Sequence, residues 1–154
     1  MPYKDFRDAI LDVGFIALER STLANNVIKE VDKLGNRTAF RYSLESGKIY
    51  IEGSLSNESA TFHISTIRNE SKKNALQTLQ KIFQVMESDL KQCAGRVNHI
   101  STDCALPLVY FATHFLGFKA VGYSEEQVEQ IIQENKGKKV GKFSIEVIPL
   151  EKEI

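Results

Sequence analysis

The sequence lacks a cysteine framework and lacks an excess of charge of either sign. Its 154 residues include two cysteines, Cys93 and Cys104, which are too few to staple a small secreted domain. We expect both to be buried apolar side chains in a reducing compartment. Lysine plus arginine number 20, and aspartate plus glutamate also number 20. Because duplex nucleic acid is normally bound by an excess of positive charge, this balance disfavours a nucleic-acid partner.

Long uninterrupted apolar runs are also missing. Residues 1–15 mix charged and apolar side chains, which is not the pattern of a signal peptide. The longest weakly polar stretch, residues 104–121, is broken by a proline, a histidine, a glycine and a lysine. We therefore expect a cytoplasmic protein without membrane contact.

Several motifs that carry chemistry are absent. There is no phosphate loop ending in Gly-Lys-Ser/Thr, no Gly-x-Gly-x-x-Gly, no Gly-x-Ser-x-Gly and no Cys-x-x-Cys. The three histidines have no spacing typical of zinc ligands, so no metal is expected. A thiol triad of Cys104, His114 and Asp103 has nothing in the sequence to order it.

Apolar residues, at 42% of the chain, are sufficient for one packed core, and the length is typical of one domain, so we expect residues 1–154 to form a single domain. Residues 4–18 suit either a short helix or an edge strand. Apolar residues recur at helical spacing over Thr22–Leu34, and Gly35 is a typical helix stop. N-terminal helices are thus predicted.

The middle of the chain changes to a two-residue period. Thr38–Leu44, Lys48–Leu55 and Ala60–Ile67 alternate apolar and polar residues, with turn residues at 45–47 and 56–58. This pattern predicts a meander of three antiparallel strands.

The second half predicts a long helix followed by a strand–helix–strand passage. An apolar stripe marks the helix over Ser71–Cys93, and Ser101-Thr102-Asp103 offers capping side chains for a later helix that ends at Gly117. The remaining expected elements are strands at Arg96–Ser101, Phe118–Tyr123 and Lys142–Leu150, and a short helix at Glu125–Glu134. The expected fold class is α+β, with a mixed sheet and the long helix across one face.

This order of elements resembles the GCN5-related N-acetyltransferase (GNAT) superfamily over roughly residues 37–149. The most specific local likeness is Phe115-Leu116-Gly117-Phe118-Lys119-Ala120-Val121-Gly122-Tyr123. It is similar to the stretch that joins the last large helix of that family to the next strand. The resemblance implies an acyl-CoA-dependent transferase.

The resemblance also implies that acetyl-CoA is the co-substrate and that its pyrophosphate binds at the start of the long helix. The family closes backbone N–H groups on the pyrophosphate with a Gln/Arg-x-x-Gly-x-Gly/Ala loop. Here Glu70 and Lys73 replace the Gln/Arg and the first glycine, and the Glu70 charge would repel phosphate. The alternative is a solvated helix start capped by Ser71 or Asn69. The implied cofactor-binding residues are Ser71, Lys72, Lys73, Asn74 and Ala75, of which Lys72 and Lys73 add positive charge.

Candidate catalytic residues also follow from the resemblance. The family's usual acid is a tyrosine on the last large helix; Thr113 holds that position, and Tyr110 lies one turn earlier. His63 and His99 lie on the strands that would part around the acyl chain, so they are candidate bases. The alternative for each histidine is a solvent-facing side chain or a satisfied hydrogen bond in the core.

Two functions therefore remain open. The first is an N-acyltransferase that moves an acetyl group from acetyl-CoA to a primary amine of a small molecule or protein. The second is a non-enzymatic α+β interaction module, either an inactive GNAT-like relic or a chaperone-like or adaptor-like domain. The sequence leaves the oligomeric state open, with a homodimer among the alternatives.

Overall fold

The computed structural model describes residues 3–4, 18–44, 47–56, 58–70, 74–93, 97–139 and 145–154. Over these residues nine strands form a mixed sheet in the order β1-β9-β7-β6-β5-β4-β3-β2, and β8 also pairs with β9. The strands are β1 (Tyr3–Lys4), β2 (Glu19–Thr22), β3 (Ile28–Leu34), β4 (Arg37–Leu44), β5 (Ile49–Ser56), β6 (Thr61–Asn69), β7 (His99–Ala105), β8 (Lys119–Ala120) and β9 (Ile145–Glu153). The helices are α2 (Ala75–Cys93), α3 (Val109–Phe115) and α4 (Glu125–Glu134), with 3₁₀ turns at Ala24–Asn26 and Leu106–Leu108. The predicted α+β class is confirmed.

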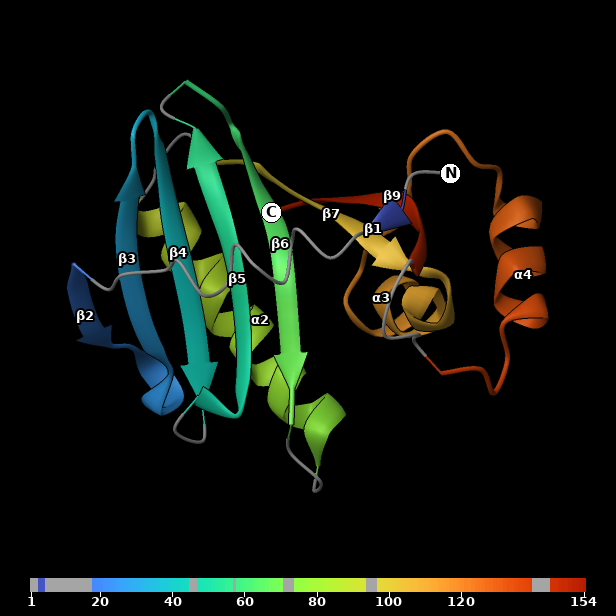
Figure 1. The fold of residues 1–154 in the computed structure, drawn as a ribbon, viewed down its shortest axis with the longest axis horizontal. Helices are drawn as coiled ribbons and strands as arrows, with labels where there is room; N and C mark the ends of the chain where they lie inside the picture. The colour runs from blue at the N-terminus through green and yellow to red at the C-terminus, as the bar shows by residue number, and fades with distance from the viewer. Residues whose placement is uncertain are drawn as a thin grey trace.

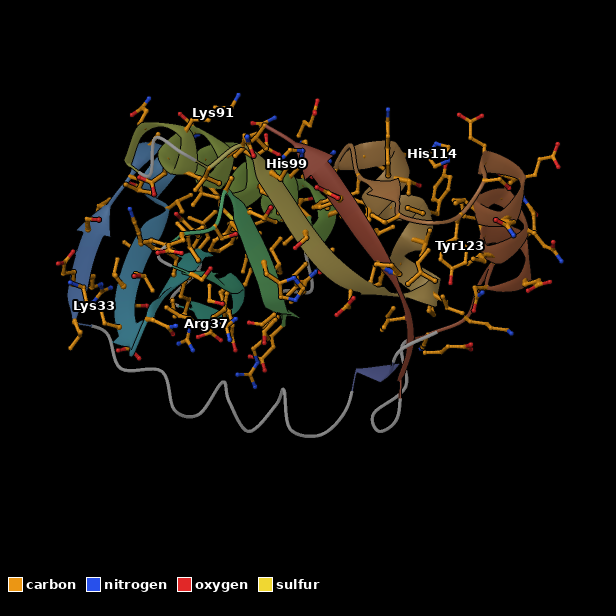
Figure 2. All side chains as sticks on the ribbon, turned by 90° about the horizontal axis from the view of Figure 1, so that it is seen from above. Lys33, Arg37, Lys91, His99, His114 and Tyr123 are labelled. Atoms are coloured by element: carbon orange, nitrogen blue, oxygen red, sulfur yellow. The ribbon has the colours of Figure 1, made fainter. Side chains whose placement is uncertain are left out.

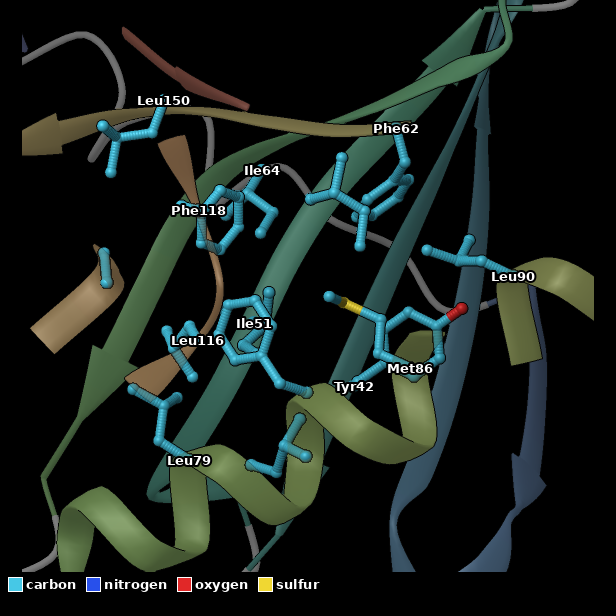
Figure 3. Close-up of a cluster of buried hydrophobic side chains, with 14 of the residues drawn as sticks. Tyr42, Ile51, Phe62, Ile64, Leu79, Met86, Leu90, Leu116, Phe118 and Leu150 are labelled. Atoms are coloured by element: carbon cyan, nitrogen blue, oxygen red, sulfur yellow. The ribbon is translucent and has the colours of Figure 1, made fainter. Parts of the chain in front are cut away.

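Helix α2 lies across one face of strands β3 to β6, while α3 and α4 lie at the end of the molecule that carries β7 and β9 (Figure 1). The apolar stripe of α2 explains this placement, because one face of the helix must be removed from water. Figure 3 shows Leu79, Met86 and Leu90 of α2 packed against the buried side chains of the sheet. None of the helices within the described residues combines the length and apolar character needed to cross a membrane.

Several predicted elements are confirmed. The meander corresponds to β4, β5 and β6, which pair antiparallel in sequence. The short helix has the predicted bounds, Glu125–Glu134, and Ser124 and Gln127 form a capping box at its start. Gly117 follows the helix α3 at a φ of +80°, a conformation that favours glycine. Residues 71–73 of the predicted long helix lie outside the described residues.

The helix predicted over Thr22–Leu34 is wrong, because this segment contains a turn and the strand β3. Asn25 and Asn26 adopt positive φ values of 57° and 62°, which interrupt any helix. Gly35 is not a helix stop but the first residue of a two-residue hairpin turn, since Leu34 pairs with Arg37. Most of the ambiguous segment 4–18 lies outside the described residues.

The capping role predicted for Ser101-Thr102-Asp103 is also wrong. These residues lie within β7, where Ile100, Thr102 and Cys104 are buried at a period of two. The strand therefore continues to Ala105, and Pro107 lies in a 3₁₀ turn before α3. The strand predicted at Phe118–Tyr123 shortens to Lys119–Ala120, and the last strand extends to Glu153.

Strands β6 and β7 form the parallel pair of the sheet, and they pair over only four residues each. The register runs from Thr61 opposite His99 to Ile64 opposite Thr102. Beyond Ile64 the two strands diverge (Figure 1). The Thr102 hydroxyl donates to the Ile64 carbonyl oxygen at 3.4 Å, at the last pair before the split. The start of α2 follows the far end of β6, so it lies on the open side of this split.

Candidate functional site

A groove lies between the start of α2 and the helix α3. Its cavity of about 450 Å³ is lined on one side by α2 and on the other by the aromatic side chains of α3. Leu76 and Phe115 are 54% and 53% exposed, so both apolar side chains face open space. Leu76 belongs to the predicted apolar stripe but lies in the groove wall rather than in the core. The lining residues are Asn74, Leu76, Gln77, Gln80, Phe111 and Phe115.

The start of α2 is suited to an anion. Its first turn contains no acidic side chain, and the first N–H groups of any helix lack partners within the helix. Glu70, which was expected to repel phosphate, forms an ion pair with Arg68 at 2.9 Å. The Asn74 carbonyl accepts the Thr78 N–H at 2.9 Å, so Asn74 joins the helix although its φ is +51°. Of the predicted cofactor-binding residues, Asn74 lines the groove, Ala75 begins α2, and residues 71–73 lie outside the described part.

The predicted acid Tyr110 lies on α3 but is not among the residues that line the groove. Its ring is 50% exposed and lies 4.5 Å from the His114 ring and 5.9 Å from the Phe115 ring, measured between centroids. The Thr113 hydroxyl donates to the Val109 carbonyl at 2.8 Å, so its proton is already used within the helix. Thr113 therefore has its hydroxyl turned back onto its own helix.

The predicted base His63 lies in the paired part of β6. Its Nδ1 lies 2.9 Å from the Ser101 Oγ on β7. Phe62 and Ile64, its neighbours along the strand, are buried in the core with α2, so His63 faces the opposite side of the sheet. It is a half-buried side chain that has a hydrogen-bond partner.

The predicted base His99 begins β7, at the closed end of the β6–β7 pair. Its Nδ1 lies 2.6 Å from the Asn98 Oδ1, and its Nε2 lies 3.6 Å from Glu151 and 3.7 Å from Glu153. Figure 2 shows His99 well away from His114 and Tyr123. The structure therefore does not place His63 or His99 among the groove residues.

His114, which the sequence interpretation did not select as a base, lines two cavities. It lines a depression of about 420 Å³ between α2 and the end of α3, which shares Gln80 and Phe115 with the groove. It also lines a second cavity of about 440 Å³ between α3 and α4. The signal available in the sequence was the i, i+4 spacing of Tyr110 with His114, which places them together on a helix.

The described residues contain no group of three or more His, Cys, Asp or Glu side chains placed to hold a metal ion. Cys104 is buried, and its Sγ donates to the Ala105 carbonyl oxygen at 3.4 Å. The site therefore offers a helix start, an apolar groove and an imidazole. No protein-family model matches this sequence, and no curated protein matches it.

Proposed function

We propose that the chain is a cytoplasmic acyl-CoA-dependent N-acyltransferase, which transfers an acetyl group from acetyl-CoA to a primary amine. The observation that supports this proposal most is the open groove beside the start of α2, next to a parallel strand pair that parts after four residues. The succession β6–α2–β7–α3 around this split agrees with the resemblance of the sequence to the GNAT superfamily.

The groove residues fit the two chemical parts of the donor. The pyrophosphate suits the unpaired N–H groups at the start of α2, with Lys72 and Lys73 adding charge. The amides of the pantetheine arm match the side-chain amides of Gln77 and Gln80. Its methylene groups match the apolar Leu76 and Phe115. From Asn74 to Gln84 the helix rises about 15 Å, a length comparable to an extended pantetheine arm.

The resemblance implies that coenzyme A binds between the third meander strand, β6, and the long helix α2, but we propose instead that it binds on the α3 side of α2. The interior between β6 and α2 is occupied by buried side chains of the core, including Ile64, Leu79 and Phe83. His63 and His99 remain predicted bases on the sheet face turned away from α2. Either of them reaches a thioester only if the acyl group passes between β6 and β7, whereas Tyr110 lies on the same helix as Phe115.

The test is to add increasing concentrations of acetyl-CoA and to measure the midpoint of thermal unfolding at each concentration. At a concentration 100 times the dissociation constant, binding stabilises the folded state by about 2.7 kcal/mol. For a chain of this size we expect the midpoint to rise by about 5 °C or more. ADP serves as the control for non-specific polyphosphate binding. No rise with millimolar acetyl-CoA, or an equal rise with ADP, would contradict the proposal.

The second candidate is a non-enzymatic interaction module. It is favoured by the exposed apolar residues gathered on and beside α3, which are typical of a surface that a partner covers. They are Leu76, Leu108, Tyr110 and Phe115. If this surface joins two copies of the chain, light scattering gives a dimer mass, and Phe115→Asp returns it to a monomer without loss of helix content.

A further inference from the structure

A second cavity lies between α3, β8 and α4, and the proposed donor site does not use it. Its volume is about 440 Å³, which is enough for a small substrate or a side chain. Val128 and Ile132 supply an apolar wall from α4, and the buried Phe118 supplies the floor. The lining residues are Thr113, His114, Phe118, Lys119, Ala120, Tyr123, Glu125, Val128, Glu129 and Ile132.

The polar lining of this α3–α4 cavity fits a primary ammonium on an aliphatic chain. Glu125 and Glu129 lie one helical turn apart on α4, so their carboxylates share a face. Tyr123 is partly buried and adds an aromatic ring, which attracts a cation. Lys119 also lines the cavity, and its backbone pairs with that of Glu151 at the edge of β9. The apolar wall then accommodates the methylene groups of such a ligand.

His114 connects this cavity to the donor groove. It lines the α3–α4 cavity and also the depression that contains Gln80 and Phe115. Figure 2 shows His114 and Tyr123 at the same end of the molecule, where α3 and α4 lie. An imidazole accepts a proton near neutral pH, and amine acylation requires such an acceptor.

We propose that the α3–α4 cavity is the acceptor site and takes a primary ammonium, and that His114 is the base that deprotonates it. This inference rests on the proposed transferase function. His114 takes one proton from the ammonium, and the amine nitrogen then forms a bond to the thioester carbonyl carbon. The carbon–sulfur bond breaks, and the second proton lost by nitrogen goes to the departing thiolate. The products are an amide, a free thiol and one proton on His114.

Binding is tested first, without any donor. Spermidine is titrated into the full chain, and amide shifts are followed by NMR, with Nα-acetyl-lysine methylamide as a second probe. We expect the largest amide shifts at the cavity residues. The double variant Glu125→Gln with Glu129→Gln should weaken the binding of spermidine by about tenfold or more. The matched control is Glu126→Gln with Glu134→Gln, on the same helix and with the same charge change. These two residues are not among the cavity lining, so we expect little change.

Catalysis is tested by the release of coenzyme A thiol. His114→Ala is expected to lower kcat by about 100-fold or more while leaving acetyl-CoA binding unchanged. Added imidazole is expected to restore part of the rate, which a purely structural role would not allow. Full activity in His114→Ala, or a loss that imidazole cannot restore, would overturn the role of His114.

The outcomes separate this inference from the proposed function. If acetyl-CoA does not bind but spermidine shifts the cavity residues, the transferase proposal and the role of His114 as its base are wrong, while the cavity remains an amine site. If acetyl-CoA binds and spermidine leaves the cavity residues unshifted, the acceptor site proposed here is wrong. Equal weakening by the two glutamate pairs also rejects it, because bulk charge would then explain the binding.

Discussion

Replacing Asp89 by alanine should destabilise the chain strongly, because Asp89 joins α2 to two strands through a buried polar cluster. Its Oδ2 accepts the Tyr42 hydroxyl at 2.7 Å and lies 2.7 Å from the Lys29 Nζ. The Asp89 and Lys29 side chains are 8% and 11% exposed, and Tyr42 is fully buried. Solvent therefore screens this cluster little.

The magnitude follows from what Asp89→Ala leaves behind. Breaking a buried ion pair typically costs about 3–5 kcal/mol, since one charge remains without its partner. A buried hydroxyl that loses its acceptor costs about 1–3 kcal/mol, but the two effects share one carboxylate and are not additive. We expect the free energy of unfolding to fall by about 3–5 kcal/mol. With a urea slope of about 2 kcal/mol/M, the midpoint should fall by about 1.5–2.5 M.

The control is an apolar replacement of the whole cluster: Lys29→Met, Tyr42→Phe and Asp89→Leu together. Buried ion pairs replaced by packed apolar side chains are often neutral or stabilising, so the triple variant should recover most of the loss. Urea unfolding followed by far-ultraviolet circular dichroism measures all variants. A loss below about 1 kcal/mol for Asp89→Ala would refute the reasoning, because it would mean that water already solvates Lys29.

Three further predictions concern the donor site and two glycines. The double variant Lys72→Glu with Lys73→Glu should bind acetyl-CoA about tenfold or more weakly, as measured by calorimetry, and should keep its urea midpoint of unfolding. Unfolding of this variant would show that the lysines are structural. Gly53→Ala should cost about 1–3 kcal/mol in urea, because the added Cβ would lie 2.5 Å from the Phe62 ring and from a backbone oxygen; a loss below about 0.5 kcal/mol would contradict this packing. Gly117→Ala should cost about 1 kcal/mol, because its φ is +80°, and Gly117→Asn should cost less; equal losses would contradict the conformational explanation.

The sequence predicted the elements whose period was unambiguous. Strand alternation located the meander, and the apolar stripe located α2, because both elements bury one face against the same core. The strand β3 was missed at Thr22–Leu34. The apolar spacing of this segment suits a helix. The positive φ values of Asn25 and Asn26 and the hairpin turn at Gly35 are instead compatible with a strand between two turns. The turn residues on either side of this segment therefore indicated a strand, but the prediction followed the apolar spacing instead.

The groove could not be predicted from the sequence in the same way. Leu76 and Phe115 are far apart in the chain, and their approach depends on how α3 packs against the rest of the core. That packing runs through Phe118, whose ring meets Phe83 of α2 edge-on at 5.9 Å between centroids. The sequence predicted five cofactor-binding residues around the start of α2, of which Asn74 lines the groove, but it could not identify the opposite wall.

The packing of Phe118 also bears on which side of the sheet carries the proposed chemistry. Figure 3 shows Phe118 beside Ile64, the last residue of β6 that pairs with β7. Phe118 is 3% exposed, and moving such a ring into water costs about 1.5–3 kcal/mol. An acyl group that entered the split beside Ile64 on its way toward His63 would meet this buried ring. The groove side requires no displacement of this ring, since Leu76 and Phe115 already face open space. We therefore propose that transfer takes place on the α3 side, with His114 as the base.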